Sequence, residues 1–394
     1  MKWREGGRRK EWLAGVFLCL VTLVNIFSVI PLLPMLRNGY QDFTAFYTDG
    51  EMVREGQSGL YDLAAQYRLQ KQFAPNVAIR QAALPYNHPP FEALLFVPLT
   101  FLNYFPAYLV WTCLNVAMVG WSLRIMRRAF PEMERLSPAF VILAATASVP
   151  VVRGLIQGQD AILLLFVLTM SLVSLEEKRD VVAGAALAAG LFKFHIVVPL
   201  TLVLAVRRPR LLLGFFPIAA VLGIISAMMV GWRGVIDYPR FLLGLEKSGA
   251  IGAIAVMPNL RGLMVEILGG DGSRPVLLWT IILSIVALVW SVWQVRGREH
   301  SIRFVFAIAS VTGILVSYHA ITHDLTLLLP IVLLLLAAPV YGSGARYRDT
   351  ILLMVVYTIF LISGPWPWLS PFWCVPVVIW IFRKFGSSQA DVFA

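Results

Sequence analysis

A few isolated polar residues stand beside or between long apolar runs, and they are the candidates for chemistry in this sequence. Asp42 directly follows the first apolar run, and Lys193 interrupts a later one. A late run closes on His319, His323 and Asp324. Polar groups are costly in hydrocarbon, so such residues indicate functional sites. A carboxylate suits proton abstraction, whereas lysine and histidine suit the binding of an anion.

Each of these residues also has a purely structural interpretation. Asp42 precedes a predicted helix and could be its N-cap, because Asp is among the preferred capping residues. Lys193 could extend its amine to a membrane interface instead of meeting an anion. His319 and His323 are four residues apart, which predicts one helical face. Two histidines alone make a weak metal site. The alternatives are that they hydrogen-bond to an oxyanion or that they have no function.

Two further segments carry polar residues among glycines. Gly154 and Gly158 form a small-x-x-x-small pair that is typical of close helix packing. This pairing leaves the adjacent Gln159 unexplained. Asn259 and Arg261 lie in a segment with Pro and Gly, a composition shared by ligand-binding loops and by plain turns. We therefore keep Gln159, Asn259 and Arg261 as candidate substrate-binding residues.

The sequence contains no compact catalytic motif. It has no G-x-x-x-x-G-K-[ST] loop for ATP, no H-E-x-x-H, no G-x-S-x-G and no His/Cys cluster at zinc spacing. It also lacks D-x-D, the spacing by which many soluble glycosyltransferases hold a metal and a nucleotide sugar. We expect neither a metal nor a cofactor, so isolated polar residues in or near a membrane must run any chemistry.

The composition predicts the elements that position these residues. Of 394 residues, 59% are hydrophobic and only 14% are charged, and the mean hydropathy is +0.76. A soluble domain is about a quarter charged, so a soluble enzyme, a DNA-binding domain and a disordered chain are excluded. The apolar runs approach the ~20 residues that cross a bilayer. We predict an all-α polytopic membrane protein, one domain over residues 1–394, with roughly twelve transmembrane helices.

Charge sets the expected orientation. The net charge is +11, and most of the 33 Lys and Arg residues fall in the N-terminus and in alternate short loops. The positive-inside rule then places both termini in the cytoplasm and the long segments 37–89 and 231–275 outside. The excess charge reflects topology and attraction to membrane lipids, so no nucleic-acid partner is expected. Runs 181–192 and 196–206 are too short to span alone and predict a hairpin with Lys193 at its tip.

The first outer segment is polar but patterned. Phe43, Phe46 and Tyr47 fall on one face of a predicted short helix, and residues 63–74 predict a second one. Aromatic amphipathic helices of this kind lie in the interface plane of a membrane. We expect Asp49, together with Glu51 and Glu55, on a solvated face of the first helix.

Taken in order, these segments resemble glycosyltransferase family 87, membrane enzymes of the GT-C type that use a polyprenyl-phosphate sugar. Its known members include polyprenol-phosphate-mannose-dependent α-1,2-mannosyltransferases. The resemblance runs from Asp42 to Asp324 and is carried by Asp42-Phe43, Leu60-Tyr61-Asp62, Tyr86-Asn87-His88-Pro89-Pro90, Gly158-Gln159, Lys193, Asn259 to Leu263, and His323. The sequence departs from the family pattern at Asp160, which stands where Asn is usual, and at Phe194, which replaces Pro. The Asn259 segment lacks the usual Ser, and the segment before His323 lacks the usual Pro and Trp.

The resemblance implies a GT-C type helical bundle and an inverting glycosyltransferase. Asp42 becomes the expected general base, and Lys193, Arg261 and His323 become the expected clamp for the donor phosphate, with Gln159, Asn259 and His319 completing the substrate-binding set. The implied donor is a polyprenyl-phosphate sugar with a mannose-like hexose, the acceptor is a glycolipid or glycan, and the location is a bacterial plasma membrane. Two alternatives remain at this stage: a multi-pass transporter, and a non-catalytic lipid-binding scaffold.

Overall fold

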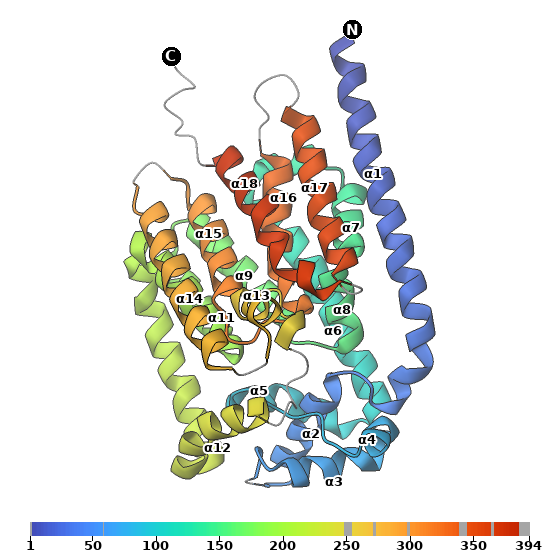
Figure 1. Ribbon diagram of the computed structural model, residues 1–394, viewed down its shortest axis with the longest axis vertical. Helices are drawn as coiled ribbons and strands as arrows, with labels where there is room; N and C mark the ends of the chain where they lie inside the picture. The colour runs from blue at the N-terminus through green and yellow to red at the C-terminus, as the bar shows by residue number, and fades with distance from the viewer. Residues whose placement is uncertain are drawn as a thin grey trace.

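The computed structural model of the chain describes residues 2–57, 59–247, 254–270, 273–297, 300–338, 345–363 and 366–385. Within these residues all regular structure is helical, as predicted (Figure 1). The first half contains α1 (Lys2–Val29), η1 (Ile30–Asn38), α2 (Phe43–Arg54), α3 (Leu63–Phe73), α4 (Pro75–Arg80), α5 (Pro90–Phe96), η2 (Val97–Phe101), α6 (Tyr104–Ala129), η3 (Pro131–Arg135), α7 (Pro138–Ala147), α8 (Val149–Gln157), α9 (Ala161–Glu176), α10 (Asp180–Ala189), η4 (Leu191–Lys193) and α11 (Phe194–Arg207). The second half contains η5 (Pro209–Leu211), α12 (Leu212–Lys247), η6 (Ile254–Val256), α13 (Leu260–Leu268), α14 (Arg274–Val295), α15 (Ile302–Leu315), η7 (Thr322–Leu328), α16 (Leu329–Ala337), α17 (Ala345–Ile362), η8 (Pro367–Trp373) and α18 (Cys374–Phe385).

Several helices have the length and composition of membrane spans. Among the described residues, four helical stretches qualify singly: Trp12–Arg54, Tyr104–Ala129, Pro209–Leu245 and Arg274–Val295. Two bent pairs, α7 with α8 and α10 with α11, raise the number to six if each pair crosses as one unit. The remaining apolar helices are shorter, at 10–17 residues. The chain is therefore an all-helical protein of the polytopic membrane type, and the predicted number of twelve spans is not confirmed.

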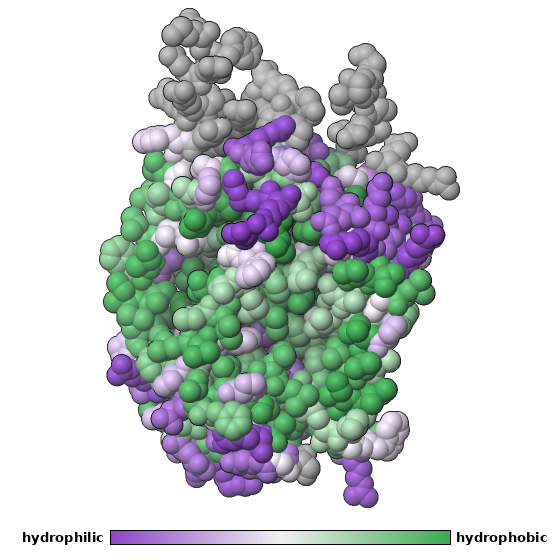
Figure 2. Space-filling model, turned by 180° about the vertical axis from the view of Figure 1, so that it is seen from behind, coloured by the Kyte–Doolittle hydropathy of each residue, from purple (hydrophilic) through white to green (hydrophobic). Residues whose placement is uncertain are grey.

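The outer surface of the bundle is apolar in a broad band. A green belt of hydrophobic residues separates hydrophilic ends in the space-filling view (Figure 2). Helices α12 and α14 contribute large exposed side chains, among them Phe216, Ile224 and Met228 on α12 and Val289 and Trp293 on α14. An exposed apolar surface of this extent is typical of contact with lipid.

The first predicted outer segment forms short helices at the end of the molecule opposite the start of α1 (Figure 1). Helices α2 and α3 confirm the two that the pattern predicts, and α4 adds a third. Phe43, Phe46 and Tyr47 are buried and join an aromatic cluster with α5 and α6. Phe46 stacks on Phe96, with ring centroids 4.8 Å apart. The aromatic face therefore fastens α2 to the bundle.

The prediction that Asp49 lies on a solvated face of α2 is wrong, because this residue is fully buried. Asp49 follows Phe46 by three residues, so both residues lie on the same side of the helix. That side packs closely on α5, because a Cβ placed on the neighbouring Gly50 would lie 2.9 Å from the carbonyl carbon of Phe96. Glu51 is half-buried, and only Glu55 is exposed.

Helix α12 changes direction where the second predicted outer segment begins. Gly231 has φ +67° and ψ 173°, a backbone conformation that interrupts the helix and that L side chains rarely adopt. The part beyond this residue turns across the lower end of the bundle, near α2 and α5 (Figure 1). Tyr238 there donates a hydrogen bond of 2.9 Å to the carbonyl of Asn87. The rest of the predicted segment includes residues 248–253 and 271–272, which lie outside the described residues.

Candidate functional site

A cavity of about 710 Å³ lies where α2, the bend between α10 and α11, and the second part of α12 meet. Its polar lining comes from six separate stretches of the chain and consists of Tyr40, Asp42, Arg80, Asn87, His88, Gln157, Gln159, Lys193, His195, Tyr238, Tyr318, His319 and His323. Its apolar lining includes Phe192, Phe194, Pro239, Leu242 and Leu243. The fold thus brings five of the seven predicted site residues to one cavity: Asp42, Gln159, Lys193, His319 and His323.

Asp42 stands at the N-cap position of α2 but does not cap it. Its side chain makes no capping hydrogen bond. Instead, Oδ2 accepts a hydrogen bond of 2.6 Å from Nε2 of Gln159. The backbone N–H of Asp42 also donates to Oε1 of Gln157 at 3.2 Å. The carboxylate is therefore oriented by the turn between α8 and α9, and the structure does not support the interpretation of Asp42 as a simple cap.

The turn that carries Gln159 is held by α6. Gly158 ends α8 in the left-handed conformation, with φ +62°. Its carbonyl accepts a hydrogen bond of 2.8 Å from Nε1 of Trp111. The hydroxyl of Tyr108 donates to the carbonyl of Ile156, also at 2.8 Å. These two bonds fix the backbone on either side of the turn and so set the direction of the Gln159 amide.

Lys193 lies at the break between α10 and α11, which are bent by 63°. The residue is 4% exposed, so its amine does not extend to an interface, and that alternative is wrong. Its Nζ lies 3.0 Å from Oδ1 of Asp160 and 2.9 Å from Oδ1 of Asp324. The ammonium thus joins the start of α9 to η7 while still lining the cavity.

His319, from the segment between α15 and η7, and His323, from η7, line the cavity. The prediction that His319 and His323 share one helical face is wrong, because His319 precedes η7 and only His323 lies within it. Burial lowers the pKa of the His319 imidazole to about 3, so this ring is neutral at neutral pH. His195 stands beside it, with ring centroids 6.4 Å apart. A neutral imidazole can exchange hydrogen bonds with a substrate without adding charge.

Asn259 and Arg261 do not line this cavity. Asn259 caps α13, since its Oδ1 accepts from the N–H of Gly262 at 2.9 Å, and its Nδ2 donates to the carbonyl of Ser317. Arg261 donates to the carbonyl of Tyr318 at 3.2 Å and stacks over the Tyr318 ring. Both predicted binding residues therefore hold the segment that presents His319.

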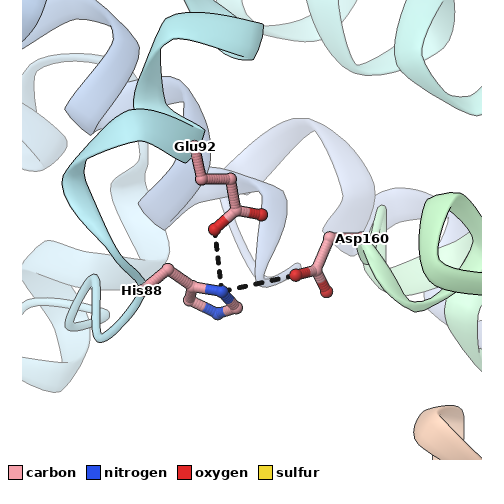
Figure 3. Close-up of side chains that lie close together, drawn as sticks. All are labelled: His88, Glu92 and Asp160. Carbon is pink, nitrogen blue, oxygen red and sulfur yellow. Dashed lines mark ion pairs between the residues drawn. The ribbon is translucent and has the colours of Figure 1, made fainter. Parts of the chain in front are cut away.

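Three residues without a role predicted from the sequence meet at the edge of the cavity, which His88 lines while Glu92 and Asp160 lie behind it. His88 Nδ1 lies 2.8 Å from Oε2 of Glu92 and 3.3 Å from Oδ2 of Asp160 (Figure 3). Glu92 and Asp160 are fully buried. The signal in the sequence was a carboxylate within the short apolar helix after Pro89-Pro90 and the substitution of Asp for the usual Asn at position 160.

Comparison with known proteins adds an independent result. The sequence profile of glycosyltransferase family 87 matches residues 86–317. The match includes His88, Gln159, Lys193 and Arg261, whereas Asp42, His319 and His323 lie outside it. No curated protein and no solved structure matches the chain. The profile covers more than half of an all-helical chain with membrane-spanning helices. The chain therefore belongs to glycosyltransferase family 87, which makes it a membrane glycosyltransferase.

Proposed function

We propose that this glycosyltransferase moves a mannose-like hexose from a polyprenyl-phosphate sugar to a lipid or glycan acceptor at the outer face of the membrane. The reaction is a single inverting step with Asp42 as the general base. One observation carries the proposal: the Asp42 carboxylate lines the cavity and is held by Gln159 instead of capping α2.

In this step the acceptor hydroxyl oxygen attacks the anomeric carbon of the donor. Asp42 takes the hydroxyl proton as the new carbon–oxygen bond forms, and the bond from that carbon to the phosphate oxygen breaks. Polyprenyl phosphate leaves with the electron pair. Gln159 keeps the accepting oxygen of Asp42 in position, which preserves the alignment that a concerted displacement needs.

The leaving phosphate requires positive charge or hydrogen-bond donors. Two carboxylates already offset the charge of Lys193. Arg80 also lines the cavity and is exposed. It has no ion-pair partner within the described part of the chain. We assign the phosphate to Arg80 together with Lys193 and His323. Arg261, expected in this role from the sequence, acts through Tyr318 instead.

The apolar side of the cavity favours a lipid-linked donor. Phe192 and Phe194 come from the bend at Lys193, and Leu242 and Leu243 come from the second part of α12. The first part of the same helix exposes large apolar side chains at the surface of the bundle. A prenyl chain can therefore lie along α12 while its phosphate sits in the polar part of the cavity.

The test of this function is the Asp42→Asn variant, assayed with a radiolabelled polyprenyl-phosphate mannose and a panel of lipid and glycan acceptors. The variant should fold and bind donor but turn over at least about a hundredfold more slowly, because a general base contributes roughly 10²–10⁴-fold. Asp62→Asn is the matched control, since exposed Asp62 does cap α3 by accepting from the N–H of Ala64 at 2.9 Å.

The control should keep its activity and lose at most about 1 kcal/mol of stability. Near-normal turnover in Asp42→Asn would remove Asp42 as the base. Turnover by the purified, lipid-free protein with a nucleotide sugar would overturn the proposed donor class.

A further inference from the structure

A cluster at the edge of the cavity contains one imidazole and two carboxylates from separate elements. His88 lies in the segment before α5, Glu92 lies on α5, and Asp160 precedes α9 (Figure 3). One potential ligand atom of each, His88 Nδ1 and a carboxylate oxygen of Glu92 and of Asp160, lies within 4.8 Å of both others. The side chains of Glu92 and Asp160 point toward the His88 ring (Figure 3).

These ligand atoms are not satisfied by ordinary hydrogen bonds. Within the described residues, His88 Nδ1 and all four carboxylate oxygens of Glu92 and Asp160 are buried without a hydrogen-bond partner. Their close contacts are ion pairs: Glu92 Oε2 and Asp160 Oδ2 both face His88 Nδ1, and Asp160 Oδ1 faces Lys193. One imidazole nitrogen supplies at most one proton to two carboxylates, so these buried oxygens lack a full set of donors.

We propose that His88, Glu92 and Asp160 bind a divalent transition-metal ion. Ligands bound to one ion at about 2.0–2.2 Å stand roughly 3–4 Å apart. The separations from His88 Nδ1, 2.8 and 3.3 Å, are close to this spacing, and the third separation is within 4.8 Å. One imidazole nitrogen with two carboxylates suits Mn²⁺ or Zn²⁺ better than Mg²⁺ or Ca²⁺, which prefer all-oxygen sites. Three protein ligands leave coordination positions open for a fourth group.

The surrounding charges fit such an ion. Glu92, Asp160 and Asp324 are three buried carboxylates, and Lys193 is the ammonium that contacts two of them. With all three carboxylates ionised and His88 neutral, as metal ligation requires, these groups carry an excess of two negative charges, which one divalent cation balances. Lys193 contacts Oδ1 of Asp160, so Oδ2 faces His88. Such an outer contact orients a metal-binding carboxylate.

The site is also within reach of the reaction. His88 lines the cavity that contains Asp42, and Gln159, which holds Asp42, is the neighbour of Asp160. An ion held by these residues would lie beside the cavity and would supply positive charge for a phosphate oxygen of the donor. This catalytic role rests on the proposed function, whereas metal binding itself does not.

The test measures metal binding without turnover. The full-length protein, purified in detergent and stripped with EDTA, is titrated with MnCl₂ and followed by electron paramagnetic resonance. We expect one saturable site. The conservative variants His88→Gln, Glu92→Gln and Asp160→Asn should each weaken Mn²⁺ binding at least about tenfold. Pulsed measurements on the bound ion should show coupling to one imidazole nitrogen.

His319→Gln is the matched control, because this histidine lines the same cavity outside the cluster. It should bind Mn²⁺ normally, and so should Asp42→Asn, even if that variant shows that the proposed base is wrong. Absence of a saturable site in the wild-type protein would overturn the inference. Loss of binding in His319→Gln, or a bound ion without nitrogen coupling, would do the same.

Discussion

Single side chains in this enzyme change role according to the partner that the fold gives them. Asp42 follows a helix-capping pattern, yet its carboxylate accepts a hydrogen bond from Gln159, 117 positions away in the chain. Asn259 fits a ligand-binding pattern, yet it caps α13 and holds Ser317. Residue type and local sequence therefore identify polar candidates, and the partner across the fold decides which of them faces a substrate.

Removing the Gln159 amide tests whether orientation of Asp42 matters for turnover. In Gln159→Leu the carboxylate loses a charge-assisted hydrogen bond, of a kind worth about 1.5–3 kcal/mol. We expect kcat to fall at least about tenfold, with little change in KM for the donor, because the base remains but is misaligned. Steady-state kinetics measure kcat and KM. The control Gln72→Leu, at an exposed position of α3, should behave as wild type. An unchanged kcat in Gln159→Leu would show that Gln159 does not position Asp42 for the reaction.

Lys193 is expected to be the most sensitive charged residue. In Lys193→Met, Asp160 and Asp324 lose their shared ammonium in a buried setting, and breaking such a pair costs about 3–5 kcal/mol. Thermal unfolding in detergent should show this loss. The double variant Lys193→Met with Asp160→Asn should recover part of it, because one buried charge is removed. A double variant less stable than Lys193→Met alone would contradict this pairing.

At the scale of elements, the site depends on how tightly short helices approach one another. The turn between α8 and α9 touches the start of α2, because a Cβ on Gly158 would lie only 2.8 Å from the Cβ of Phe43. Phe43 directly follows Asp42, so any shift at this contact is passed to the carboxylate. The bend of 63° between α10 and α11 likewise places Lys193 at the inner wall.

Gly158→Ala tests this contact between elements. The residue has φ +62°, so a side chain there is strained and also collides with Phe43. We expect a loss of about 1–3 kcal/mol in stability, together with reduced turnover in the folded fraction. Gly154→Ala, four residues earlier in α8, is the matched control, because its Cβ would meet Ile162 at an ordinary 3.4 Å. Equal effects of the two substitutions would argue against a special role for the turn.

At the scale of the whole molecule, two ends flank an apolar belt (Figure 2). The short helices α2, α3 and α4 occupy one end, and the start of α1 occupies the other (Figure 1). Arg303, at the start of α15, forms ion pairs with Glu132 of η3 and with Glu176 at the end of α9, so these three elements lie close together. These segments belong to loops that the charge pattern assigns to the cytoplasm. The cavity with Asp42 therefore belongs to the end predicted to face outward.

Cysteine labelling of intact cells checks this orientation. In a variant whose three native cysteines are replaced, a membrane-impermeant maleimide should label a cysteine at exposed Arg68 on α3. A cysteine at Lys178 should react only after the membrane is opened, because basic loops remain on the cytoplasmic side. Labelling of Lys178 from outside, with Arg68 protected, would reverse the topology.

The sequence by itself determined the class of the protein and many of its elements. Apolar content, helical periodicity and the order of short motifs are local properties of the chain, so they predicted an all-helical membrane protein, the helices α2 and α3, and the family. They also selected Asp42, Gln159 and Lys193 as candidate site residues.

Only the tertiary structure decided which polar residues meet. The ion pair of Lys193 with Asp324, the hydrogen bond of Gln159 with Asp42 and the contact of His88 with Asp160 each join residues more than seventy positions apart. Such contacts depend on helix packing and on the bends at Gly158 and Lys193, which local patterns do not encode. For the same reason the sequence misplaced Asp49 on a solvated face: its periodicity identified the helix but not which side α5 would cover.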